Sequence, residues 1–146
     1  MAMERTLVLI KPDGVARRLA GLTLDKLESS GMELVAAAVV RPSDSLARAH
    51  YREHEGKPFF NGIVNFLKGD LHPQSGGRVY AFVFKGEDAV TAIRHVVGAT
   101  NPDEAAPGTV RGCFGKIRNG LMENVVHASS GAADAEREIA LWFPNL

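Results

Sequence analysis

Hydrophobic residues in this chain fall into short continuous runs and longer periodic ones. The continuous runs, at 5–10, 32–40, 79–84 and 124–127, are rich in aliphatic and β-branched residues and are followed or preceded by turn residues. Runs of this composition and length predict β-strands. The first of them, RTLVLI, stops at Lys-Pro-Asp-Gly, so we expect Lys11 in the loop that follows a strand.

Between the strands, apolar residues recur three or four positions apart, which predicts amphipathic helices. Leu22, Leu24 and Leu27 mark one helix that Gly31 closes, and Ser43 is a suitable N-cap for another. The predicted helices are 19–31, 43–51, 59–67, 87–95 and 133–143.

Two segments lack this periodicity. Residues 68–77, KGDLHPQSGG, have the composition of a loop, and residues 98–122 contain five glycines and two prolines. A long irregular stretch in a compact domain is usually functional. The order β-α-β, two helices, β-α-β predicts an α+β fold: a ferredoxin-like βαββαβ four-stranded antiparallel sheet with helices on one face, an inserted helical hairpin and this long irregular loop.

Composition narrows the class of protein. With 146 residues, we expect one domain over 1–146. Lys plus Arg equals Asp plus Glu at 17 each, so no overall field favours nucleic acid or a membrane, and any anion site must be local. The single cysteine, Cys113, cannot form an internal disulfide, which fits a cytoplasmic protein and leaves Cys113 as a small buried residue or a bystander.

Candidate chemistry lies beside the turns. The P-loop pattern G-x-x-x-x-G-K-[ST] is absent from the sequence. Several polar residues instead follow strands or sit in the glycine-rich stretch, where a rigid scaffold usually presents functional groups. They are Lys11, Arg94, Thr100, Asn101, Arg111, Asn124 and His127.

Two other functions deserve comparison. His50, Glu53 and His54 match the zinc pattern H-x-x-E-H, although no third ligand follows them, so two surface histidines on a helix are the better interpretation. Tyr80 and Phe82 alternate with Phe84 on one strand, as in an RNA-binding sheet, but the neutral charge favours core packing.

Taken together, five blocks of the sequence resemble the nucleoside diphosphate kinase family. They are ERTLVLIKPDGV at 4–15, HYREHEGKPFFNGIV at 50–64, GATNPDEAAPGTVRG at 98–112, NVVH at 124–127 and AEREIALWF at 135–143. The resemblance implies a ping-pong transfer of a terminal phosphate from a nucleoside triphosphate to a diphosphate through a phosphohistidine. The partners implied are these nucleotides, Mg²⁺ bound mainly by their phosphates, and further copies of the chain in a hexamer, tetramer or smaller homo-oligomer. A catalytically weak or silent nucleotide-binding relative is the alternative.

The resemblance also assigns roles to residues. His127 matches the nucleophile, and Glu138 matches the carboxylate that orients it. The matched substrate-binding residues are Lys11, Arg94, Thr100 and Arg111 for the phosphates, Tyr51 near the histidine, Asn124 with Lys11 for the ribose, and Phe59 with Ile63 for the base. No residue of the chain matches a metal ligand.

The chain departs from the family in three places. After His127 the family usually continues G-S-D-S-x-E, whereas this chain has Ala-Ser-Ser-Gly-Ala-Ala, so only Ser129 is retained and the acidic residues are lost. We expect this loop to be looser with its chemistry intact. The segments 68–77 and 115–123 look longer than in the family, and we expect them to alter the rim of the site or the contacts between subunits.

Overall fold

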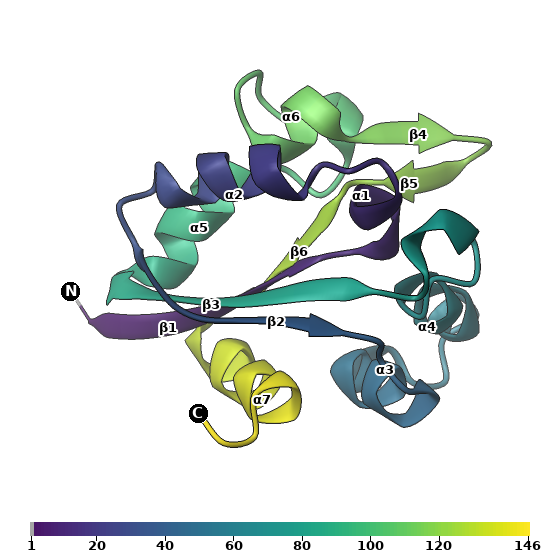
Figure 1. Ribbon diagram of the computed structural model, residues 1–146, viewed down its shortest axis with the longest axis horizontal. Helices are drawn as coiled ribbons and strands as arrows, with labels where there is room; N and C mark the ends of the chain where they lie inside the picture. Colours follow the sequence, from purple (N-terminus) through teal and green to yellow (C-terminus); the bar gives the residue numbers. More distant parts are fainter. Residues whose placement is uncertain (1) are drawn as a thin grey trace.

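The computed structural model describes residues 2–146 and has a four-stranded antiparallel sheet at its centre (Figure 1). The strand order is β2-β3-β1-β6, with β1 paired to β3 over eight positions and to β6 over three. This is the order of a ferredoxin-like sheet, so the predicted fold class is confirmed. The strands are β1 (Met3–Ile10), β2 (Glu33–Val40), β3 (Val79–Glu87) and β6 (Val126–Ala128).

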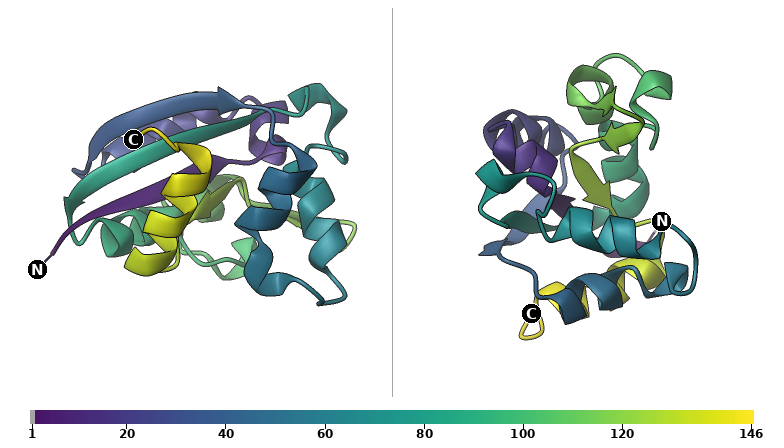
Figure 2. Two further views of the ribbon diagram at one scale, coloured as in Figure 1. Left: turned by 90° about the horizontal axis from the view of Figure 1, so that it is seen from below. Right: turned by 90° about the vertical axis from the view of Figure 1, so that its right-hand side faces the viewer.

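Helices cover both faces of the sheet, so the prediction of helices on one face only is wrong (Figure 2). One face carries α2 (Ala20–Glu28) and α5 (Ala89–Val97). The other carries α7 (Ala132–Trp142) and the inserted hairpin of α3 (Asp44–His50) and α4 (Phe60–Leu67). The continuous apolar runs already pointed this way, because a strand needs apolar residues on both sides only when both sides are covered.

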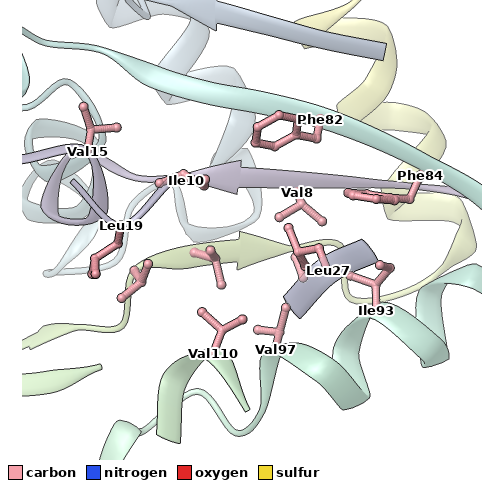
Figure 3. Packing of buried hydrophobic residues seen from close by; sticks show 13 residues of the cluster. Val8, Ile10, Val15, Leu19, Leu27, Phe82, Phe84, Ile93, Val97 and Val110 are labelled. Carbon is pink, nitrogen blue, oxygen red and sulfur yellow. The ribbon is translucent and has the colours of Figure 1, made fainter. Parts of the chain in front are cut away.

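Alternation along the strands divides the core into two clusters. Val8 and Ile10 of β1 pack with Phe82 and Phe84 of β3 against α2 and α5 (Figure 3), whereas Leu7 faces the cluster beneath α3, α4 and α7. Because the two phenylalanines are buried, they form no exposed platform for nucleic-acid bases, and the core interpretation is confirmed.

Local capping fixes the inserted hairpin. The Ser43 side chain accepts a hydrogen bond from the backbone N–H of Leu46 at 3.1 Å, as an N-cap should. The helix ends at His50, and Arg52–His54 form a separate 3₁₀ turn, so the predicted continuous helix 43–51 is nearly right. The turn after β1 was not predicted to be helical, yet Pro12–Ala16 form the short helix α1, with proline at its first position.

The segment 98–122 is less irregular than expected. It contains a 3₁₀ turn (Pro102–Glu104), the helix α6 (Val110–Phe114), and a hairpin of β4 (Lys116–Arg118) and β5 (Leu121–Glu123). These elements are three to five residues long. The 3₁₀ turn and α6 are capped by the side chains of Asn101 and Thr109, and β4 and β5 are held by their pairing with each other. The periodicity of apolar residues therefore could not predict these short elements. Cys113 in α6 is exposed. None of the helices in residues 2–146 is long and apolar enough to span a membrane.

Candidate active site

A cavity of about 700 Å³ opens where β1 and β6 meet the segments between α3 and α4 and between α5 and β6. Every predicted substrate-binding residue lines it, and so does His127. The structure thus gathers residues from positions 11 to 127 of the chain into one place. Glu138 does not line the cavity but lies behind it, in contact with His127.

His127 is held by a buried carboxylate. Its Nε2 lies 3.0 Å from Oε1 of Glu138, which is only 3% exposed and comes from α7. The hydroxyl of Ser129 donates to the same oxygen at 2.7 Å. A carboxylate that accepts from Nε2–H leaves Nδ1 as the imidazole nitrogen with a free lone pair. The arrangement gives the imidazole of His127 a defined tautomer, with its Nδ1 lone pair available.

A second histidine supports His127 from behind. The rings of His50 and His127 meet edge to face with centroids 4.4 Å apart, and Nε1 of Trp142 donates to Nδ1 of His50 at 3.1 Å. Burial, together with the charges of His127 and Arg137, lowers the pKa of His50 well below its usual value. His50 is therefore a neutral packing partner.

This placement excludes the zinc interpretation of H-x-x-E-H. His50 is buried beside His127, whereas His54 lies in the 3₁₀ turn with its Nδ1 3.2 Å from Nζ of Lys57. Within residues 2–146, the side chains that lie close enough to hold a metal are His50, His127 and Glu138, and His54 is not among them. The motif is interrupted because the helix ends at its first histidine.

Cations crowd one end of the cavity. Burial and the nearby charge of Arg111 lower the pKa of Lys11 to about 8, although Asp13 opposes the shift. Burial and repulsion by Arg94 lower the pKa of Arg111 to about 10. Arg111 is anchored by hydrogen bonds from its guanidinium to the carbonyls of Gly98 at 3.0 Å and Val126 at 2.8 Å. Such a cluster favours a polyanionic ligand, because an anion would relieve the repulsion.

The backbone between Asn124 and His127 is strained. Val125 has φ of +74°, which is rare for a β-branched residue, and the N–H of Val126 bonds to the carbonyl of Asn124 at 2.8 Å. Asp13 holds this turn by accepting from the N–H of Val125 at 2.9 Å. The turn directs Asn124 into the cavity, where its side chain accepts from Lys11 and donates to the carbonyl of Thr100.

Apolar side chains also line the cavity. Phe59 is 49% exposed there, and Ile63 lies one helical turn further along. Tyr51 lines the cavity close to His127, and burial together with the charge of Glu138 raises its pKa above the usual value, so its hydroxyl stays neutral. The lining therefore combines cationic and apolar side chains, and we call Lys11, Arg94 and Arg111 its cationic half and Phe59 with Ile63 its apolar half.

Sequence reasoning missed several members of the site. Asp13 was noted only as a turn residue, and nothing in its spacing indicates a bond to Val125. Ser129 was recognised as retained without a role. Leu71 and Met122 also line the cavity, and they come from the segments 68–77 and 115–123, for which a change to the rim of the site stays a prediction.

Comparison with known proteins decides the family. The model of nucleoside diphosphate kinase matches residues 4–146. The chain belongs to the nucleoside diphosphate kinase family. A nucleoside diphosphate kinase of Caldanaerobacter subterraneus subsp. tengcongensis is 46% identical over 144 residues, which cover 99% of this chain and 96% of that protein.

Solved nucleoside diphosphate kinases share the fold. The halophilic enzyme of Halobacterium salinarum in complex with CDP is 42% identical, with a TM-score of 0.83 over 99% of this chain and 90% of that one. A transition-state mimic of the Borrelia burgdorferi enzyme with bound vanadate and ADP is 34% identical, with a TM-score of 0.85 over 98% and 88% of the two chains. As a family member, the protein transfers the terminal phosphate of a nucleoside triphosphate to a diphosphate by a ping-pong mechanism through a phosphohistidine.

Proposed function

We propose that His127 is the residue that carries the phosphoryl group, and that Glu138 orients it. The observation behind this proposal is the pairing of Nε2 with a buried carboxylate at 3.0 Å on the wall of a cavity that also holds Lys11, Arg94 and Arg111. A nucleophile, the group that fixes its tautomer and the cations for the leaving phosphates thus share one site.

The transfer then proceeds in two successive displacement steps. Nδ1 of His127 attacks the terminal phosphorus of the triphosphate, the N–P bond forms as the bond to the bridging oxygen breaks, and the nucleoside diphosphate leaves. The second step reverses this sequence with another diphosphate as acceptor. The imidazole gains positive charge as the N–P bond forms, and Glu138 stabilises that charge while accepting from Nε2–H.

The cationic half of the cavity suits the phosphates. Lys11, Arg94 and Arg111 balance the charge that spreads over the phosphoryl oxygens during transfer, and Thr100 offers a hydroxyl donor. Tyr51, with its raised pKa, remains a neutral hydroxyl beside them.

The apolar half suits the nucleoside. We assign the base to Phe59 and Ile63, because an exposed aromatic ring stacks on any base through its π-face. Asn124 and Lys11 bind the ribose, since their mutual hydrogen bond leaves further donors and acceptors at the boundary of the two halves.

A divalent metal ion accompanies the nucleotide in this family, and we propose Mg²⁺. Among residues 2–146, Glu53 is the carboxylate that lines the cavity, beside three cations. This donor set fits an ion that arrives on the phosphates and keeps several waters, which is how Mg²⁺ is commonly bound. When bound, it neutralises phosphate charge. Among the described residues of the cavity lining, the carboxylate of Glu53 is the one acidic group that could help to hold the ion.

We also propose a homo-oligomer, whether hexamer, tetramer or smaller. β2 is an edge strand of the sheet, and Val39 on that strand is 64% exposed. An edge strand with a large exposed apolar residue is a natural surface for a second copy. The cytoplasmic location and the single domain over 1–146 stay predictions.

The test is covalent labelling with ATP carrying a labelled terminal phosphate. We expect a phosphoprotein that is stable to base and labile to acid in the wild type and in His95→Gln, a control histidine on α5 that is exposed. His127→Gln should carry none, and Glu138→Ala should bind nucleotide but become labelled slowly. Acid-labile label in His127→Gln would overturn the assignment, and no label in the wild type would favour a silent relative.

A further inference from the structure

The segments 68–77 and 115–123 meet at one edge of the cavity. Figure 1 shows the chain between α4 and β3 lying beside β5. Nε2 of His72, in the first segment, is 2.6 Å from Oε2 of Glu123, at the end of β5. Both side chains are buried, with exposures of 7% and 2%. A hydrogen-bonded pair therefore joins two segments that are 51 positions apart.

Glu123 is bound as an ionised carboxylate. Arg118, across the β4–β5 hairpin, donates to its two oxygens at 2.8 and 3.3 Å. Burial alone would raise the pKa of Glu123, but the hydrogen bonds and charges of Arg118 and His72 outweigh it and lower the pKa to about 2. This buried charge does not line the cavity and takes no part in the transfer as proposed above.

The pair is connected to Lys11 from two sides. The residue after Glu123 is Asn124, which accepts a hydrogen bond from Lys11. The ring of His72 meets the edge of Phe66 with centroids 5.1 Å apart, and the Lys11 ammonium lies 5.0 Å from the centre of the Phe66 ring. A shift of Glu123 or His72 would therefore displace Lys11 or Asn124.

The joined segments also bring apolar side chains to the rim of the cavity. Leu71 directly precedes His72 and is 51% exposed, and Met122 directly precedes Glu123 and is 42% exposed. Large apolar side chains left half exposed on a cavity wall gain stability when an apolar ligand surface covers them. Of the parts of a nucleotide, only the nucleoside offers such a surface.

We propose that Glu123 and His72 are a positioning pair for nucleoside recognition. By tying the β4–β5 hairpin to the 68–77 loop, they hold Asn124 for the ribose and place Leu71 and Met122 against the base. Of the cations assigned to the phosphates, Arg94 and Arg111 lie on α5 and α6, away from the joined segments, whereas Lys11 is linked to the pair through Asn124 and Phe66. The inference rests on the proposed function, because it assumes that a nucleotide occupies this cavity.

The test compares two ligands that differ only in the nucleoside. Dissociation constants for ADP and for inorganic pyrophosphate, each with magnesium chloride, are measured by calorimetry on the full chain. We expect Glu123→Ala to weaken ADP about tenfold and pyrophosphate by about threefold at most. Both ligands lose part of the Lys11 contact, whereas only ADP also loses the hydrogen bonds and contacts of the nucleoside. Glu123→Gln, which keeps one acceptor, should recover part of the loss. Glu28→Ala, a glutamate exposed on α2, is the matched control.

Leu71→Ala provides a second variant that does not disturb the buried pair. Because Leu71 is half exposed, this variant should fold, and we expect it to weaken ADP about threefold without affecting pyrophosphate. If Glu123→Ala fails to fold, Leu71→Ala decides the outcome.

Equal losses for the two ligands, or ADP binding unchanged, would overturn the proposal. A wild type that neither binds ADP nor becomes phosphorylated would instead overturn the proposed function on which it rests.

Discussion

Ser129 makes a quantitative prediction possible, because its hydroxyl serves two buried groups at once. It donates to Glu138 at 2.7 Å and accepts from the backbone N–H of Leu7 at 3.1 Å, and the residue is fully buried. Ser129→Ala removes one oxygen and leaves the N–H of Leu7 without a partner. No bulky group enters the core.

The magnitude follows from these two bonds. An unsatisfied buried N–H costs about 1–3 kcal/mol, and a hydrogen bond to a charged group is worth about the same. Allowing for overlap between the two effects, we expect the free energy of unfolding to fall by about 3 kcal/mol. For a chain of this size, that corresponds to a Tm lowered by roughly 6 to 12 °C.

Catalysis should suffer separately. Without Ser129, the hydrogen bond from His127 is the remaining short one on Oε1 of Glu138, so the carboxylate is less well oriented. We expect phosphoenzyme formation to slow about tenfold, which corresponds to about 1.4 kcal/mol of activation free energy. Calorimetry gives the Tm, and rapid-quench labelling at a temperature where both proteins are folded gives the rate.

Ser29→Ala is the matched control, because Ser29 is exposed at the end of α2 and its hydroxyl bonds only to a local carbonyl, that of Lys26. It should change the Tm by less than about 2 °C. If Ser129→Ala also leaves the Tm within about 2 °C and the rate within about twofold of the wild type, the hydroxyl does not anchor Glu138 and this account of the nucleophile's support is wrong.

Three further predictions concern charge. Because the pKa of Glu123 is lowered to about 2, its ionised form stabilises the fold by about 3 kcal/mol above pH 5. That contribution is lost as pH falls from about 4.5 towards 2. Denaturant unfolding should therefore show Glu123→Gln destabilised at pH 7 but much less so at pH 3. With a pKa of about 8, Lys11 should lose its proton as pH rises from 7 to 9, so ADP affinity should fall over that range in the wild type and fall less in Lys11→Arg, as measured by calorimetry. Ser130→Asp should change single-turnover labelling by less than about twofold, because Asp134 already supplies an acidic group to the first turn of α7; a large gain in rate would show that the missing acid limits catalysis.

Much of the fold could be predicted because it depends on burial. The strands and the long helices bury whole faces, so their runs of apolar residues mark them in the sequence. The hairpin of β4 and β5 could not be found in this way, since all three residues of β4 are exposed. Its position depends on Glu123 binding His72 and Arg118, which no local pattern in the sequence reveals.

The residues of the site also divide into those that could be predicted from the sequence and those that could not. Residues that match the family's blocks, such as His127 and Lys11, were found by resemblance, and the structure brings them together. Asp13 and Leu71 were not found. Asp13 accepts from a backbone N–H more than a hundred positions away, and Leu71 lies outside the five blocks that carry the resemblance.

His127, the proposed nucleophile, lies on the shortest strand of the four-stranded sheet. β6 has three residues, forms one edge of the sheet and pairs with β1 alone, so its hydrogen bonds to the sheet are few. Segments of this kind open by local fluctuation at a lower free energy than the whole fold, and hydrogen exchange reports such openings. The amides around His127 should consequently exchange faster than those of β1 and β3. On heating, activity should therefore fall as this edge opens, before β1 and β3 separate.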